Sequence, residues 1–124
     1  MRYLADTSIW VDFLAFNNPT LGTYLNDDKI SIHPYVTAEV ALGSLSDRTL
    51  IIETMETLPP VEIATHDEVM NLIETEKLYS RGIGYVDMHL LASVMLEKNC
   101  LLWTKDKRLL AAAQDFGLGV DFMG

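Results

Sequence analysis

Four acidic residues recur in this 124-residue chain at positions where an α/β fold would gather them. Asp6 and Asp106 each follow a short apolar segment that reads as a strand, and Glu39 and Asp87 interrupt the apolar faces of predicted helices. Ligands of open α/β sheets bind outside the carboxyl ends of the strands. Clustered carboxylates repel one another unless a cation lies between them, and Mg²⁺ and Mn²⁺ prefer carboxylate and water ligands. We therefore predict a divalent-metal site formed by these four side chains.

Each acid also has a simpler structural explanation. Asp6 could cap the helix that follows it, and either Thr104 or Asp106 could cap the last helix. Asp87 falls in the first turn of an apolar helix, where a cap would also explain it. Glu39 could lie on the flank of its helix if the apolar stripe is rotated. The four acids taken together, in this order, favour the metal site over four separate caps.

The apolar pattern predicts the elements that would position these acids. Strands are expected at residues 2–5, 29–33, 61–63, 101–103 and 120–122. Helices are expected after Asp6, at 20–26, from Pro34 to about 45, at 49–57, from Thr65 to about 79, at 86–98 and after Asp106. Short strands that alternate with helices predict an α/β fold, a three-layer α/β/α sandwich with a short, mainly parallel central sheet. We expect one domain, residues 1–124.

Composition narrows the class of protein. An apolar fraction of 49% fits a globular chain. The net charge of −9 argues against binding of nucleic acid through overall charge. No apolar run is long enough to cross a bilayer, no signal peptide is visible, and the lone Cys100 cannot form an internal disulfide. These features predict a cytoplasmic protein.

The segments around the four acids resemble the motifs of the PIN-domain nucleases. These segments are Asp6-Thr7-Ser8, Thr37-Ala38-Glu39-Val40, Asp87-Met88-His89-Leu90-Leu91-Ala92-Ser93 and Thr104-Lys105-Asp106-Lys107-Arg108-Leu109. Their order and spacing, and the length of the chain, are similar to those of the VapC toxins of bacterial and archaeal toxin–antitoxin pairs. The resemblance covers essentially the whole chain.

The resemblance implies a PIN-like fold and a ribonuclease that depends on Mg²⁺ or Mn²⁺ and acts on single-stranded or structured RNA. It assigns Asp6, Glu39, Asp87 and Asp106 to catalysis and metal binding. It also implies a homodimer and a small antitoxin, through which alone the complex would contact DNA. Residues near the motifs that could contact the RNA are Thr7, Ser8, Arg81, Thr104, Lys105, Lys107 and Arg108.

The mechanism expected for such a site is hydrolysis by a water whose pKa the metal lowers. Glu39 or Asp87 would orient that water. His89 is not expected to be the base, because it points to a different side of its helix from Asp87. Base stacking by Tyr35 or Tyr85, which lie near the acids, is a weaker interpretation. The remaining aromatic residues of apolar stripes are expected in the core: Trp10, Phe13, Tyr24, Tyr79 and Trp103.

Three other functions compete with the nuclease. A PIN-like binding protein could keep the acids but act mainly through an antitoxin as a co-repressor. A phosphotransfer enzyme with Asp6 as nucleophile would need a second acid where Ser8 stands. A receiver domain would need adjacent acids after the first strand, which are missing. The apolar helices after Asn17 and after Ser46 are candidates for the dimer surface.

Overall fold

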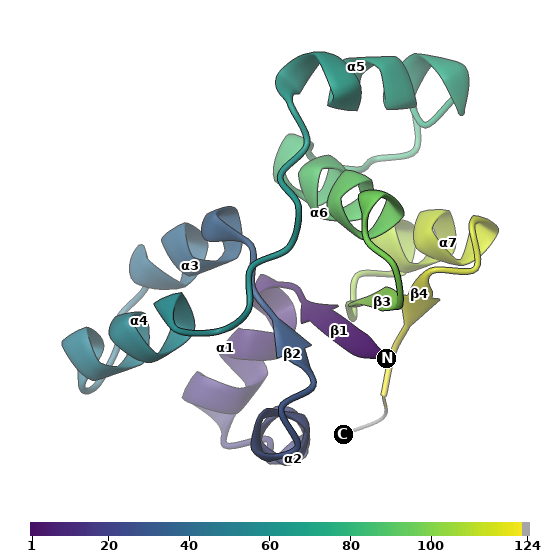
Figure 1. Ribbon diagram of the computed structural model, residues 1–124. Coiled ribbons are helices and arrows are strands. Elements are labelled where there is room, and N and C mark those ends of the chain that lie inside the picture. Colours follow the sequence, from purple (N-terminus) through teal and green to yellow (C-terminus); the bar gives the residue numbers. More distant parts are fainter. Residues whose placement is uncertain (123–124) are drawn as a thin grey trace.

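Four short strands form one central parallel sheet in the computed structural model, which describes residues 1–122 (Figure 1). They are β1 (Arg2–Ala5), β2 (Ile30–Ser31), β3 (Cys100–Trp103) and β4 (Gly119–Val120), in the spatial order β2-β1-β3-β4. β1 and β3 are in register from Arg2 opposite Cys100 to Ala5 opposite Trp103. Because both strands end at the same level, the residues that follow them, Asp6 and Thr104, become neighbours.

Seven helices are described around this sheet: α1 (Thr7–Phe16), α2 (Thr20–Asn26), α3 (Pro34–Ala41), α4 (Arg48–Glu56), α5 (His66–Thr75), α6 (Tyr85–Leu96) and α7 (Lys107–Asp115). In Figure 1, α1 and α2 lie on one side of the sheet and α6 and α7 on the other, while α5 lies outside α6. This arrangement confirms the predicted α/β fold with a parallel sheet and helices on both faces. The predicted domain, 1–124, extends two residues beyond the described part of the chain. Within that part, no helix is both long and apolar enough to span a membrane.

The central strands are the most deeply buried elements. Leu4, Ala5 and Leu102 have no exposed surface, as expected for strands covered on both faces. Trp10 and Trp103 are buried, and Phe13 and Tyr24 pack against the core, as predicted. Full burial of a large apolar side chain stabilises a fold by about 1.5–3 kcal/mol. The strand ends that precede Asp6 and Asp106 are therefore held in place by the packed core.

The predicted strand at residues 61–63 is wrong. Only a single parallel bridge, between Ile32 and Pro60, forms there. Pro59 and Pro60 have no N–H to donate, so a strand ladder cannot extend toward them. The N–H of Glu62 instead donates to the side chain of Glu97 at 2.6 Å, which removes it from any ladder.

Two helices end earlier than predicted. α3 stops at Ala41, before Gly43 and Ser44, and leaves Leu42 88% exposed. α5 stops at Thr75, and the chain then turns through Lys77 and Ser80, both with positive φ. Tyr79 lies in this turn and is 53% exposed, so its predicted place in the core is wrong. The other predicted elements agree with the structure to within a few residues at their ends.

Candidate acidic site

Asp6 lies at the carboxyl end of β1 and is only 4% exposed. Its Oδ1 accepts hydrogen bonds from Ser8 Oγ at 2.5 Å and from the N–H of Ile9 at 3.3 Å. Its Oδ2 accepts a hydrogen bond from the hydroxyl of Thr104. Burial raises the pKa of Asp6, and the bonds from Ser8 and Thr104 partly offset that rise. Asp6 therefore caps α1, as its simpler explanation held, and is also a buried carboxyl group at the edge of the sheet.

Asp106 follows β3 in a matching way. Its Oδ1 accepts hydrogen bonds from the N–H groups of Arg108 and Leu109, both at 2.9 Å, so Asp106 rather than Thr104 caps α7. Thr104 is fully buried and supports both acids, because its hydroxyl donates to Asp6 and accepts from the N–H of Asp106 at 3.0 Å. One threonine thus connects the acids that follow the two central strands.

Glu39 lies on the exposed flank of α3, while Val36 and Val40 of the same helix are buried. This placement matches the rotated stripe that the sequence left open. Glu39 Oε1 accepts a hydrogen bond of 2.6 Å from Thr7 Oγ1, at the first turn of α1. Thr7 therefore holds Glu39 beside Asp6, although 32 residues separate Thr7 from Glu39 in the chain.

Asp87 is the third residue of α6 and does not cap it, because the N-cap is Gly84. Its pKa is raised from 3.8 to about 6, first by burial and then by the negative charges of Asp6, Asp106 and Glu39. The other three predicted acids therefore lie close enough to Asp87 to disfavour its ionisation. The acids after β1, on α3 and after β3 thus act on Asp87 in the first turn of α6, and a metal bound by all four stays a prediction.

The acids fit a hydrated cation better than a tightly caged one. Among residues 1–122, no three His, Cys, Asp or Glu side chains converge closely enough to form a complete ligand set. Mg²⁺ usually keeps several waters and takes only one or two direct carboxylate ligands. The four acids supply carboxylate oxygens that are near one another but not in contact, which is compatible with a hydrated Mg²⁺ ion. They supply no sulfur ligand, which a soft metal would prefer.

The basic residues near the acids are partly neutralised. Arg81 forms an ion pair with Asp115 at 2.9 Å, and Lys105 forms one with Asp12 at 2.5 Å. The hydrogen bond to Asp12 raises the pKa of Lys105. Lys107 and Arg108, at the start of α7, are exposed. Two of the four predicted phosphate-binding cations thus already have a carboxylate partner.

Two curated proteins from Mycobacterium tuberculosis are similar to this chain. Both are named Ribonuclease VapC32, one from strain CDC 1551 / Oshkosh and one from strain ATCC 25618 / H37Rv. Each is 40% identical over 117 residues, which cover 94% of this chain and 94% of the relative. The chain belongs to the VapC family. This confirms the predicted resemblance, although no family model matches the chain.

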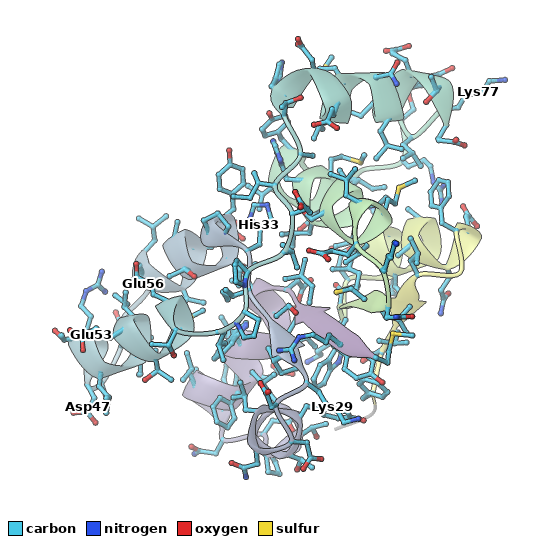
Figure 2. All side chains as sticks on the ribbon, viewed as in Figure 1. Lys29, His33, Asp47, Glu53, Glu56 and Lys77 are labelled. Atoms are coloured by element: carbon cyan, nitrogen blue, oxygen red, sulfur yellow. The ribbon has the colours of Figure 1, made fainter. Side chains whose placement is uncertain are left out.

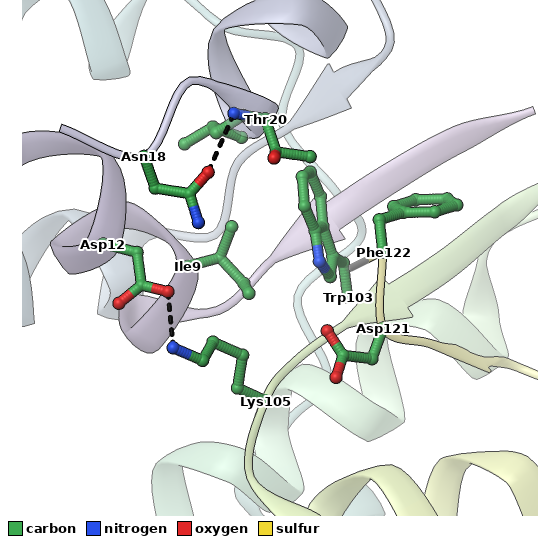
Figure 3. Close-up of a pocket in the computed structure, with 9 residues that line it drawn as sticks. Ile9, Asp12, Asn18, Thr20, Trp103, Lys105, Asp121 and Phe122 are labelled. Atoms are coloured by element: carbon green, nitrogen blue, oxygen red, sulfur yellow. Dashed lines mark hydrogen bonds and ion pairs between the residues drawn. The ribbon is translucent and has the colours of Figure 1, made fainter. Parts of the chain in front are cut away.

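In this member of the VapC family, a cavity of about 160 Å³ borders the acids without containing them. Trp103 and Lys105 line it, whereas Thr104 between them bonds to Asp6, because successive side chains of an extended segment point to opposite sides. Figure 3 shows the Asp12–Lys105 ion pair at this cavity, with Asp121 and Phe122 on its opposite side. The cavity and the acids are therefore separated by the backbone that follows β3.

Sequence reasoning named Tyr35 and Tyr85 for base stacking but missed the group of five rings to which they belong. We call this group the aromatic cluster: His33, Tyr35, His66, Tyr85 and His89. It gathers all three histidines of the chain. The one local signal was the spacing of Tyr85 and His89, which places them on one face of a helix. His89 is buried among these rings, which agrees with the prediction that it does not serve as the base.

Proposed function

We propose that this VapC-family protein is a divalent-metal-dependent ribonuclease and the toxin of a toxin–antitoxin pair. The observation that carries the proposal is the group of four carboxylates near the carboxyl ends of the central strands, where the charges of the other three act on Asp87. The name of the relatives, Ribonuclease VapC32, supports RNA as the substrate. Mg²⁺ or Mn²⁺ is the cofactor that this donor set suits.

The residues of the chain divide the work. Asp6 is held rigid by Ser8, Thr104 and Ile9, so it provides a fixed carboxylate oxygen for a cation. Thr7 fixes Glu39 beside Asp6. When bound, Mg²⁺ or Mn²⁺ would lower the pKa of a water and offset the charge of the phosphate. Asp87, which lies near the charges of the other three acids, is suited to orient the attacking water.

The proposal also includes the two protein partners, a small antitoxin and a second copy of the chain. Three exposed apolar residues belong to helices that contact one another in the order α1, α3 and α4: Phe16 at the end of α1, Leu42 after α3 and Leu50 on α4, at 73%, 88% and 64% exposure. Apolar surface of this kind favours a protein partner. Of the two helices predicted for the dimer, α4 contributes Leu50, whereas Leu21 of α2 is buried in the core.

The alternative is a PIN-like binding protein that acts mainly through its antitoxin. The ion pairs of Arg81 and Lys105, together with the net charge of −9, favour it, because they reduce attraction to RNA. The two functions differ in whether the acids bind a cation and support turnover.

The test is cleavage of total RNA by the purified chain with Mg²⁺, with Mn²⁺ and with EDTA, together with calorimetric metal binding. We expect cleavage only with metal. We expect a loss of at least about 10-fold in Glu39→Gln, because even groups that only support metal ligands are worth about 10–100-fold. Glu53→Gln is the matched control, since Figure 2 shows Glu53 on the outer side of α4.

Cleavage that persists in EDTA, or that is unchanged in Glu39→Gln, would identify a contaminating nuclease and refute the mechanism. Metal binding without cleavage would point to a requirement for a specific RNA. Absence of both would favour the binding protein.

A further inference from the structure

Two exposed tyrosines flank a buried histidine in the aromatic cluster. The ring of His89 lies 4.9 Å from that of Tyr35 and 4.7 Å from that of Tyr85, at interplanar angles of 72° and 80°. His89 is 2% exposed, whereas Tyr35 and Tyr85 are 38% and 44% exposed. Edge-to-face contacts of this kind are favourable for aromatic rings. His89 therefore supports both tyrosines from beneath and leaves part of each ring open to solvent.

Hydrogen bonds fix the rest of the aromatic cluster. His33 Nδ1 accepts a hydrogen bond of 3.0 Å from the N–H of Tyr35, so the imidazole caps α3 and is neutral. Burial and the neighbouring His89 lower the pKa of His33 to about 4, in agreement with that neutral state. His66 Nδ1 and the hydroxyl of Tyr85 share a hydrogen bond of 2.6 Å. Both tyrosines are thus ordered before any ligand arrives, which reduces the entropy cost of binding.

The aromatic cluster adjoins the acids. Tyr35 precedes Glu39 by four residues on α3, which places it one turn away on the same side of the helix. Tyr85 lies two residues before Asp87 on α6, so the two side chains leave the helix on different sides. Figure 2 shows His33, whose ring contacts Tyr35 and His89, at the junction of α3 and α6. A nucleotide stacked on Tyr35 would therefore lie one helical turn from Glu39, on the same side of α3.

An RNA-binding surface on this chain needs a source of affinity other than charge. With a net charge of −9 and with Arg81 and Lys105 paired to aspartates, release of counterions from RNA can contribute little. Stacking of a base on an aromatic side chain needs no charge and tolerates any sequence. It also requires a base that is not stacked within a duplex, which selects single strands.

We propose that Tyr35 and Tyr85 form a stacking platform that binds an unpaired RNA base beside the four acids, with His89 as the positioning residue between them. This inference rests on the proposed ribonuclease function and specifies its substrate as RNA with an unstacked nucleotide at the cleavage site.

The test measures binding of a short fluorescently labelled single-stranded RNA by anisotropy in EDTA, and steady-state cleavage with metal. We expect Tyr35→Leu and Tyr85→Leu, which keep most of the packing volume, to weaken binding about 10-fold each, within the range of known base stacking. Tyr35→Phe and Tyr85→Phe should stay within about 3-fold, because the ring remains. In cleavage, the Leu variants should raise KM more than they lower kcat, as expected for lost uniform binding.

Tyr79→Leu is the matched control, because Tyr79 is similarly exposed but lies in the turn after α5. Its RNA binding should equal that of the wild type, and a duplex of the same sequence should bind more weakly than the single strand. Near-ultraviolet circular dichroism of each variant verifies the fold.

If the wild type binds and cleaves RNA but the Leu variants do so equally well, the platform is refuted and the nuclease stands. If Phe variants bind as weakly as Leu variants, the hydroxyls rather than the rings act, which also refutes it. A wild type that neither binds nor cleaves RNA refutes both proposals.

Discussion

The Asp87→Asn variant is expected to unfold at a temperature about 3–6 °C higher than the wild-type chain in EDTA, while it loses cleavage. Ionised Asp87 is disfavoured in the fold, since burial and three neighbouring acids raise its pKa from 3.8 to about 6. A shift of this size corresponds to at most about 3 kcal/mol, and partial exposure of the side chain reduces the effect to about 1 kcal/mol. Asparagine keeps the shape and removes the charge.

The higher melting temperature of Asp87→Asn should depend on pH, because the penalty that it removes depends on the ionisation of Asp87. Between pH 3.8 and about 6, folded Asp87 binds more protons than unfolded Asp87, so the wild type loses stability as the pH rises through this range. Above about pH 6 the penalty is complete. The difference in melting temperature between Asp87→Asn and wild type should therefore be large at pH 7 and small near pH 4. A difference that is constant across this range would show that Asp87 is not the group responsible.

Loss of function should accompany the gain in stability. A divalent cation offsets the repulsion of the acids, so Mg²⁺ or Mn²⁺ should raise the melting temperature of the wild type more than that of Asp87→Asn. Asp47→Asn is the control, because Figure 2 shows Asp47 at the outer end of α4, and its positive φ suits asparagine as well as aspartate. A lower melting temperature for Asp87→Asn would mean that its carboxylate stabilises the fold.

The sequence predicted those parts of the site that depend on local order. Asp6 and Asp106 each follow a buried strand and cap the next helix, and both events are decided by residues within a few positions. Because β1 and β3 pair in register, their carboxyl ends lie side by side, and so do the segments that carry Asp6 and Asp106. The start of α5 is equally local, because Thr65 and Glu68, three residues apart, form its capping box.

Features decided by distant contacts were not predictable from pattern. Residues 61–63 have the composition of a strand, but Glu97, remote in the chain, takes the N–H of Glu62. Whether Glu39 faced the core or the solvent depended on which face of α3 packs inward, and Val36 and Val40 occupy that face. The aromatic cluster joins rings from the starts of α3 and α5 and from α6. These rings are far apart in the sequence, so no local spacing of histidines and tyrosines predicts the cluster.

Asp6→Asn and Asp6→Ala are expected to separate catalysis from folding. The asparagine side chain keeps an oxygen that can accept the hydrogen bonds of Ser8 and the N–H of Ile9, so the cap of α1 remains. Its amide can only donate to the hydroxyl of Thr104, which then lacks an acceptor for its own hydrogen. The stability of Asp6→Asn should therefore lie between those of wild type and Asp6→Ala. Cleavage should fall by at least about 100-fold, because a group that binds the metal directly is worth no less than those that only support it.

Asp6→Ala should lose stability as well as cleavage. It removes the cap of α1 and leaves the fully buried hydroxyl of Thr104 without its acceptor. Loss of a cap costs about 1 kcal/mol, and a buried donor without a partner costs about 1–3 kcal/mol. Thermal unfolding in EDTA should thus place Asp6→Ala clearly below both wild type and Asp6→Asn. Equal stability of Asp6→Ala and wild type would mean that Asp6 contributes no capping or buried hydrogen bond. Full cleavage by Asp6→Asn would mean that cleavage does not need the Asp6 carboxylate to hold a cation.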